Sequence, residues 1–264
     1  MKEELIALTE KLNNPSEKLN IAREYLQAFT LRSLHESEAF QSLSFVGGTA
    51  LRFLYQLPRF SEDLDFSLID SQNYTPEKWM KKLKRDLEFS NFNGSVLWKD
   101  KNIVHTGWVK VDGLLKEMGL SPMASQKLSI KIDVDTNPPK EAILENIAIN
   151  KYFLMAMQCY NLSSLMAGKI HALCCRQYTK GRDWYDFMWY RARIPKVEPN
   201  LNLLQNALNQ TLDKPWPAKN WQKKLKDSLD RFDEKLIIKD VLPFLERPEE
   251  AKLLTKENFK NLIS

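Results

Sequence analysis

Two short acidic alternations contain the residues of this sequence that are best suited to chemistry. In the first, "DLDFSL" at residues 63–68, Asp63 and Asp65 alternate with apolar residues. Residues i and i+2 of a strand lie on one face, about 7 Å apart at Cα. Their carboxylates can therefore converge on one Mg²⁺, which prefers oxygen ligands at about 2.0–2.1 Å. The alternative interpretation is an ordinary half-buried strand with two acids on its solvated face.

The second alternation, "KLSIKIDVD", places Asp133 and Asp135 opposite a row of apolar residues. If this strand lies beside the first, it supplies the third carboxylate that two Mg²⁺ ions need in phosphoryl or nucleotidyl transfer. Asp133 and Asp135 point to the same side, so either can be the third carboxylate. The strand could also pair elsewhere, which would leave the first two acids without this partner.

Gly47 and Gly48 stand between the apolar run "LSFV" and a predicted helix that begins at Thr49. The chain has only 8 glycines, so an adjacent pair indicates a local demand of the backbone. The free N–H groups and the dipole at a helix N-terminus suit an anion, and the Thr49 hydroxyl could add a further hydrogen bond. The pattern is neither a Walker A loop nor GxGxxG, and a tight strand-to-helix turn without a ligand is the alternative.

Lys169 lies in "SSLMAGKIHALCCRQ", a segment with helical periodicity. At 100° per residue it falls inside the apolar stripe formed by Leu165, Ile170 and Leu173, rather than on the wet face. A buried lysine is costly unless its ammonium group reaches an anion or extends out to water. The position therefore favours a binding role for Lys169, with phosphate as the expected ligand.

The segment "KGRDWYDFMWYRAR" predicts a helix in which Asp183 and Asp186 are i, i+3 neighbours close to Arg182. Acids in the first turn of a helix also offset its dipole, which is the simple structural interpretation. Together with Lys180 and the aromatic residues, the acids and Arg182 could instead form the polar wall of a cleft.

The periodicity elsewhere predicts an α+β fold with a helical C-terminal half. We expect helices at 3–13, 16–34, 49–56 and 76–90, and strands at 43–46, 63–68, 95–98, 102–111 and 127–135. From Glu141 onward nearly every segment has helical periodicity, with breaks near 195–200 and 213–218. The expected domains are N-terminal helices packed on the core (1–35), a mixed sheet-and-helix domain (36–140) and a helical domain (141–264).

Composition narrows the function classes. The net charge of +5 is spread along the chain, which permits a nucleotide or nucleic-acid partner without demanding one. Three irregularly spaced cysteines argue against a disulfide framework or a zinc site, and three unrelated histidines suggest no hydrolytic triad. No run approaches the roughly 20 apolar residues of a membrane span, so we expect a cytoplasmic protein.

Four segments together resemble the AbiEii/AbiGii toxin family of nucleotidyltransferases, in the polymerase-beta-like superfamily. They are, in order, "GGTALRFLY…RFSEDLDFSL", "IKIDV", "GKIHAL" and "KGRDWYDF", and the resemblance extends over roughly residues 20 to 245. It implies a nucleotidyltransferase domain at 36–140 and a helical domain that closes a cleft over an NTP and Mg²⁺. Members of this family are toxins of type IV toxin–antitoxin or phage-defence systems, and some add nucleotides to the 3′ end of tRNA.

The resemblance also implies a role for each matching residue. Gly47, Gly48 and Thr49 would hold the triphosphate, and Asp63, Asp65 and Asp133 the metal, with Asp133 also the general base. Lys169, Arg59 and Arg182 would bind the nucleotide, and Asp183 and Asp186 would form an acidic pair of which at least one is essential. The chain departs from the Gly-Ser of many superfamily members by carrying Gly-Gly-Thr.

The expected function is thus Mg²⁺-dependent transfer of a nucleoside monophosphate from an NTP to RNA, with the tRNA 3′ end as the acceptor implied by the family. A cognate antitoxin would hold the protein in check, and no membrane partner is expected. Two alternatives stay open from the sequence. One is transfer to a protein hydroxyl, and the other is a catalytically silent protein that binds RNA or a partner.

Overall fold

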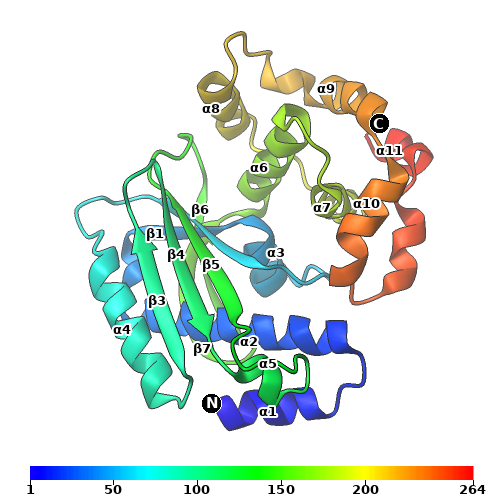
Figure 1. Cartoon of the computed structure of the whole chain (residues 1–264). Helices are drawn as coiled ribbons and strands as arrows, with labels where there is room; N and C mark the ends of the chain where they lie inside the picture. The colour runs from blue at the N-terminus through cyan, green and yellow to red at the C-terminus, as the bar shows by residue number, and fades with distance from the viewer. Residues whose placement is uncertain (264) are drawn as a thin grey trace. The chain divides into compact units, whose positions relative to one another are not determined.

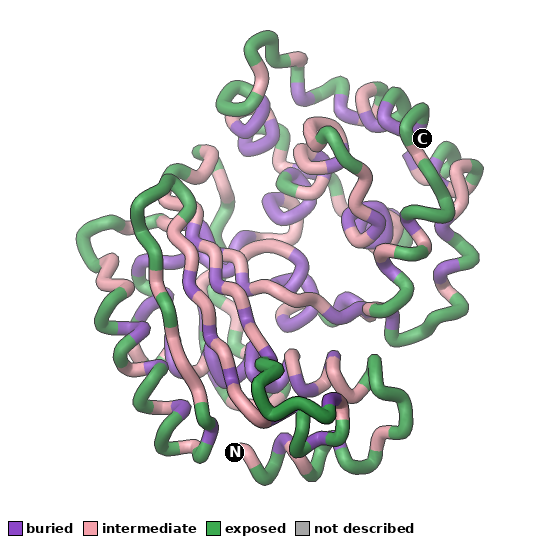
Figure 2. Tube along the Cα trace, in the orientation of Figure 1, coloured by how far each residue is buried: buried purple, intermediate pink, exposed green. Residues whose placement is uncertain are grey.

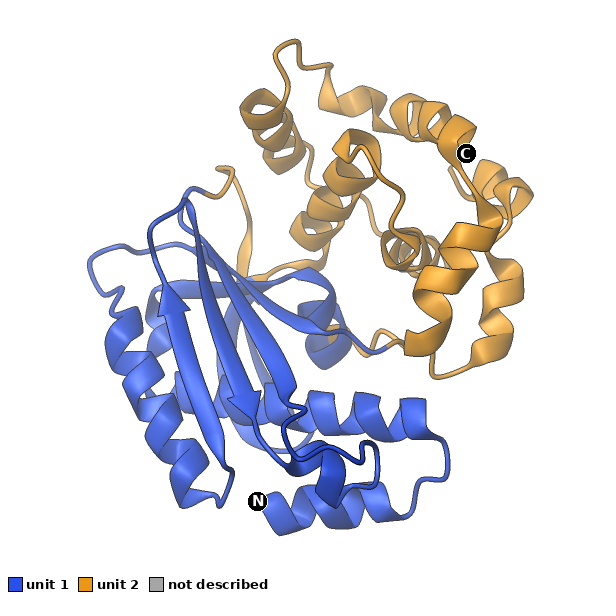
Figure 3. Ribbon diagram, in the orientation of Figure 1, with its two compact units in different colours: residues 1–54, 60–137, 146–159 blue, residues 55–59, 138–145, 160–264 orange. Residues whose placement is uncertain are grey.

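A computed structural model describes residues 1–263 and divides the chain into two compact units (Figure 3). Unit 1 contains residues 1–54, 60–137 and 146–159. Unit 2 contains residues 55–59, 138–145 and the chain from Tyr160 onward. Both units therefore take in segments from both sides of the predicted boundary at 140, so the domains are not continuous stretches of sequence.

Unit 1 is a mixed α+β structure, as the sequence predicts. Its helices are α1 (Lys2–Glu10), α2 (Pro15–Glu36), α3 (Gly47–Tyr55), α4 (Pro76–Phe89) and α5 (Leu114–Glu117), with a 3₁₀ turn at Ala39–Gln41. Its strands are β1 (Leu43–Val46), β2 (Asp63–Leu68), β3 (Gly94–Lys99), β4 (Val104–Val111), β5 (Leu128–Asp135), β6 (Leu144–Asn150) and β7 (Leu154–Tyr160). The predicted strands 43–46 and 63–68 are confirmed at both ends.

The seven strands form one sheet in the order β3-β4-β5-β2-β1-β7-β6 (Figure 1). The central pair, β2 and β5, is parallel, whereas β5 pairs with β4 and β2 pairs with β1 in antiparallel fashion. Parallel strands need a long crossover between them. Here α4 leads the chain from β2 to the far edge of the sheet, and the β3–β4 hairpin brings it back to β5.

One face of this sheet carries the core of unit 1. Along β5 every second residue is buried, and the buried set is Leu128, Ile130, Ile132 and Val134. Figure 1 shows α2 and α4 behind the sheet, and Figure 2 shows buried positions along both helices. The intervening residues of β2 and β5 lie on the opposite face, and the acids among them are half-buried. The alternation in the sequence therefore reports a sheet with two chemically different faces.

The prediction of helix from Glu141 onward is wrong for β6 and β7. These segments form the last two strands of the sheet, with Met155, Met157 and Cys159 buried at every second position of β7. Methionine has a good helix propensity and β7 lacks the β-branched residues typical of strands. Buried residues do alternate along β7, but their residue types are more typical of a helix, so the sequence did not predict a strand.

Unit 2 is helical apart from its share of β6 and β7. Its helices are α6 (Leu162–Cys175), α7 (Gly181–Arg191), α8 (Leu201–Thr211), α9 (Trp221–Ser228), α10 (Glu234–Val241) and α11 (Lys256–Leu262). Short 3₁₀ segments lie at Ala218–Asn220, Leu229–Arg231, Leu242–Phe244 and Pro248–Leu253. No described helix has the length and apolar character needed to cross a membrane.

A buried ion cluster anchors α3, the helix that follows the glycine pair. The Glu24 carboxylate on α2 accepts from Arg52 Nε at 2.5 Å, from Lys151 Nζ at 2.9 Å and from the Tyr152 hydroxyl at 2.9 Å. Only 2% of Glu24 is exposed. Burial raises the pKa of Glu24, but Arg52 and Lys151 outweigh it and the net shift is downward. The cluster ties α3 both to α2 and to the turn between β6 and β7.

Replacing Glu24 with Gln should destabilise the protein by about 3–5 kcal/mol, because the buried charge of Arg52 would lose the counter-charge of Glu24. The free energy of unfolding in urea measures this loss. Glu36→Gln is the matched control, since Glu36 also pairs with an arginine and a lysine but is 41% exposed, and it should cost less than about 1 kcal/mol. Equal losses in the two variants would contradict the anchoring role.

Candidate functional site

The predicted acids of unit 1 meet because β2 and β5 pair in one particular register. Asp65 is the direct partner of Asp133, Asp63 is the partner of Lys131, and Asp135 is the partner of Ser67. Neighbouring strands lie about 4.8 Å apart, and paired residues of adjacent parallel strands point to the same face. Asp63, Asp65 and Asp133 are therefore neighbours, whereas Asp135 lies one step further along, where its Oδ1 accepts from the Asn137 amide at 2.9 Å.

Asp133 makes two hydrogen bonds on this face. Its Oδ1 accepts from the Thr106 hydroxyl at 3.0 Å, and its Oδ2 is 2.6 Å from Lys131 Nζ. The hydrogen bond to Asp133 raises the pKa of Lys131, and the charges of Asp63 and Asp65 add to this shift against the opposing effect of burial. One ammonium thus lies in the combined negative field of three carboxylates.

The donor set fits Mg²⁺, because all three side chains offer carboxylate oxygens and a cation among them is already stabilised. Within residues 1–263, no three acidic, histidine or cysteine side chains already stand in a metal-holding group. The ammonium of Lys131 donates to Asp133 Oδ2 at 2.6 Å on this face. Lys131 was not among the residues that the sequence singled out, although it alternates with Asp133 on the same strand face.

The glycine turn lies directly against one of these acids. Gly47 has a φ of +79°, a left-handed conformation that favours glycine, and a Cβ at this position would overlap the carboxylate of Asp65. The Thr49 hydroxyl donates to the backbone carbonyl of Asp63. Val46, the last residue of β1, is the register partner of Asp65. The turn and the acidic strand therefore form one structural element.

Thr49 is fully buried and its hydroxyl is committed to Asp63. What the turn can offer an anion is thus the set of N–H groups in the first turn of α3, which have no partner within the helix. This differs from the sequence interpretation, in which the Thr49 hydroxyl itself could reach a phosphate. Gly48 is buried beside it in the same first turn.

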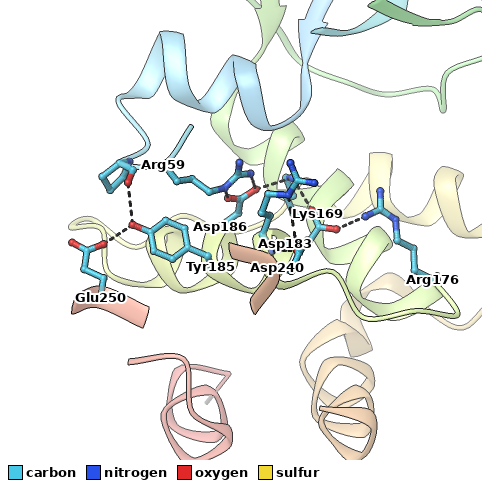
Figure 4. A network of polar contacts seen from close by, with 10 residues as sticks. Arg59, Lys169, Arg176, Asp183, Tyr185, Asp186, Asp240 and Glu250 are labelled. Carbon is cyan, nitrogen blue, oxygen red and sulfur yellow. Dashed lines mark hydrogen bonds and ion pairs between the residues drawn. The ribbon is translucent and has the colours of Figure 1, made fainter. Parts of the chain in front are cut away.

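The other predicted residues come together in unit 2 as a buried ionic network (Figure 4). Arg59 forms two parallel bonds to Asp186, from Nε to Oδ1 at 2.6 Å and from Nη2 to Oδ2 at 2.7 Å. Lys169 Nζ lies 2.7 Å from Asp186 Oδ2 and 2.8 Å from Asp183 Oδ1. Arg176 pairs with the remaining oxygen of Asp183. Two carboxylates thus join three cations.

Burial is the main cost of this network, and the charge pairs overcome it. Asp186 is 0% and Arg59 2% exposed. Burial raises the pKa of Asp183, but Lys169 and Arg176 lower it to a net value of about 2. Burial lowers the pKa of Lys169, but the charges of Asp183 and Asp186 raise it by more, so the net shift is upward. The network therefore holds Lys169 charged and fixed on α6, and the anions that its ammonium group reaches are two carboxylates, whereas the sequence predicted phosphate.

Two predicted ligands of the nucleotide have other partners. The buried bidentate bond of Arg59 favours a positioning role over direct contact with phosphate. Arg182 lies at the start of α7, where its backbone N–H donates to Asp240 Oδ2 at 3.1 Å and its guanidinium lies 4.3 Å from the centroid of the Phe244 ring. Arg176, which pairs with Asp183, is the residue that sequence reasoning missed here.

A small hollow of about 30 Å³ lies beside the network in unit 2. Its wall includes Arg176, Lys180, Asp183 and Arg231. The pKa of Lys180 is lowered, mainly by burial. Asp183 opposes this shift, and the neighbouring charges of Arg182, Lys169 and Arg176 add to it. Unlike Lys169, Lys180 forms no ion pair with any residue of the described chain. The hollow is therefore an electropositive place in which an anion would be stabilised.

Comparison with known proteins identifies the family. The model of the AbiEii nucleotidyltransferase toxins of type IV toxin–antitoxin systems matches residues 30–260. This chain belongs to that family. Asp63, Asp65, Asp133, Lys169, Asp183 and Asp186 all lie within the matched range.

A solved structure from Helicobacter pylori shares the fold of this AbiEii family member. The crystal structure of JHP933 is 18% identical with a TM-score of 0.51, over 92% of this chain and 88% of that one. A second H. pylori structure, described as a candidate nucleotidyltransferase, is 18% identical with a TM-score of 0.48, over 89% and 88% of the two chains. No curated protein matches the chain.

Gly47→Ala should lower the free energy of unfolding by roughly 1–3 kcal/mol, because alanine disfavours the left-handed backbone and its Cβ would displace the Asp65 side chain. Urea unfolding measures the loss. Gly168→Ala is the control, because a Cβ there meets nothing within 4 Å and alanine is the better helix former inside α6. An unchanged stability in Gly47→Ala would contradict the close contact of turn and acid.

Asp183 should make stability depend on pH in a defined window. Its folded pKa of about 2 lies below the ordinary value of 3.8, so its contribution is complete above about pH 4 and is lost as the pH falls towards 2. The loss should be about 2 kcal/mol. Unfolding of the wild type and of Asp183→Asn, followed from pH 5 to pH 2, measures it, and the difference between the two proteins should shrink across this range. A constant difference would contradict the assignment.

Proposed function

We propose that this chain transfers a nucleoside monophosphate from an NTP to an RNA acceptor, with the tRNA 3′ end as the acceptor class. The product would block translation and growth until a cognate antitoxin neutralises the enzyme. The proposal is supported above all by the β2–β5 register, which sets Asp65 beside Asp133 on a half-buried sheet face next to the glycine turn. Membership of the toxin family supplies the reaction class.

In the proposed reaction, Asp133 accepts the proton of the acceptor hydroxyl. The hydroxyl oxygen then forms a bond to the α-phosphorus of the NTP, the bond from that phosphorus to the α–β bridging oxygen breaks, and pyrophosphate leaves. Mg²⁺ held by Asp63, Asp65 and Asp133 would supply a lower pKa for the hydroxyl and offset the charge on the phosphates. Thr106 orients Asp133 through the bond to Oδ1.

The remaining residues bind and position. The first N–H groups of α3 would hold phosphate oxygens, because glycine allows close approach to the backbone there. Lys169 is the proposed phosphate-binding lysine of unit 2, and Asp183 and Asp186 keep it charged and in place. Arg59 acts through Asp186, which it fixes by two hydrogen bonds.

The test is transfer of label from each α-labelled NTP to total tRNA in the presence of Mg²⁺. Asp63→Asn or Asp65→Asn should lower the rate by roughly 100-fold or more, the size of loss expected when a charge-stabilising group is removed. Asp135→Asn is the matched control, because Asp135 lies on the same face beside Ser67 and should leave the rate within a few-fold of wild type.

Three outcomes would contradict the proposal. The first is full transfer by an Asp63→Ala/Asp65→Ala double variant. The second is that Asp135→Asn loses transfer while Asp133→Asn transfers label like the wild type. The third is label on protein with none on RNA, which would establish transfer to a protein hydroxyl instead. Expression in cells gives an independent reading, since growth arrest should disappear in the Asp63→Ala variant if the toxic act is this reaction.

A further inference from the structure

The acidic face of the sheet continues across β4 and β3 into a differently composed surface. Register pairs Leu97 of β3 with Trp108 of β4, Trp108 with Lys131 of β5, and Lys131 with Asp63 of β2. These four residues thus form one straight row across four strands. The neighbouring row runs from Lys99 through Thr106 and Asp133 to Asp65.

This part of the face carries two large apolar side chains, Leu97 and Trp108, where a solvated sheet face is usually polar. Leu97 is 50% exposed and Trp108 is half-buried, whereas Val109 and Val111, which point to the other face, are 1% exposed. The helices α2 and α4 of unit 1 pack on that other face, and Figure 1 shows α2 behind the strands and α4 beside β3. The Trp108 ring is therefore held in place by the strand without being part of the core.

Lysines surround this ring. Lys110 Nζ lies 5.8 Å and Lys131 Nζ 6.0 Å from the centroid of the Trp108 ring. Lys99 stands on the same face one row away. Throughout residues 1–263, neither Lys99 nor Lys110 forms an ion pair with an acidic side chain. An aromatic surface with uncompensated lysines is complementary to a nucleic-acid strand, whose bases stack and whose phosphates are negative.

The topology separates this surface from the turn that would hold the NTP phosphates. The glycine turn follows β1, and β1 lies on one side of the β2–β5 pair that bears the carboxylates. Trp108 on β4 lies on the other side of that pair. Two strand spacings of about 4.8 Å separate the strand of Trp108 from that of Asp63. The two substrates of a transfer reaction would thus reach the carboxylates from opposite sides.

We propose that Trp108 is the stacking platform for a base of the acceptor RNA, and that Lys110 and Lys99 neutralise the phosphates beside it. The ligand is a single-stranded RNA end with a free 3′-hydroxyl. A base on Trp108 lies one strand spacing, about 4.8 Å, from the strand of Asp133 and two spacings, about 10 Å, from the strand of Asp63 and Asp65. This inference rests on the proposed function for the identity of the acceptor, but the binding surface can be tested without turnover.

The experiment is fluorescence anisotropy of a short, 5′-labelled single-stranded RNA with the full-length protein, in EDTA and without NTP. Trp108→Ala should weaken binding by about 5- to 150-fold, the range expected for loss of one base–aromatic stack. Trp108→Phe should retain most of the affinity, because it keeps an aromatic face. Lys110→Ala should weaken binding and reduce the slope of log Kd against log salt by about 0.7, the value for one phosphate contact on a single strand.

The matched control is Trp189→Ala, which removes a half-buried tryptophan of α7 that packs against Arg193. This variant should bind the RNA like the wild type. Thermal unfolding of each variant checks that it is folded, and the expected loss of binding in Lys110→Ala keeps the test decisive if Trp108→Ala does not fold. Binding of a non-hydrolysable NTP, measured with Mg²⁺ by calorimetry, should be unchanged in Trp108→Ala.

The outcomes separate this inference from the proposed function. Equal RNA affinity in wild type and Trp108→Ala, or no RNA binding by the wild type, overturns the inference even if label transfer occurs. Weaker NTP binding with unchanged RNA binding also overturns it, because the platform would then serve the incoming nucleotide. RNA binding that depends on Trp108 in a protein that transfers no label supports the surface and rejects the reaction.

Discussion

Parallel pairing of β2 with β5 is the constraint on which the arrangement of unit 1 depends. A slip of one residue would turn Asp133 towards the core and bring Ile132 or Val134 out, because side chains alternate between the faces. The hydrophobic row on β5 prevents this slip, since four consecutive inward positions are apolar. The same residues that make the core thus fix which acids are neighbours. The chemistry of one face is set by the packing of the other.

Both units place carboxylates out of full contact with water, and both compensate them with cations from distant parts of the chain. Glu24 is held by Arg52 and Lys151, and Asp186 by Arg59, which is 127 residues away. Such pairs add little net stability compared with an apolar core. Loss of one member, however, leaves the other charge buried and uncompensated, which costs the full desolvation penalty. They therefore fix positions more than they strengthen the fold.

Much of the architecture was predictable from local patterns. The strands at 63–68 and 128–135 were found because apolar and acidic residues alternate, and the lysine in α6 was recognised because its neighbours on the helix are apolar. The strand at 154–160 was missed because methionine occupied its inward positions. The pairing of Arg59 with Asp186 could not be foreseen, since no local pattern relates a loop residue to a helix so far along the chain. Lys131 stands in the same alternating segment as Asp133, but only the register of β2 and β5 shows that it is paired with Asp63.

The glycine at the start of α7 gives the signature "KGRDWYDF" a second meaning. A Cβ on Gly181 would overlap the backbone carbonyl of Ile237 in α10, so the two helices are in contact at the level of their main chains. Selection for folding alone would keep this glycine in a descendant that had lost all enzymatic activity. Asp63 and Asp65 lie on a half-buried face, and packing of the core does not require aspartate at these positions. In homologous chains, Gly181 would therefore mark inheritance of the fold, and the acidic pair would mark retention of the chemistry.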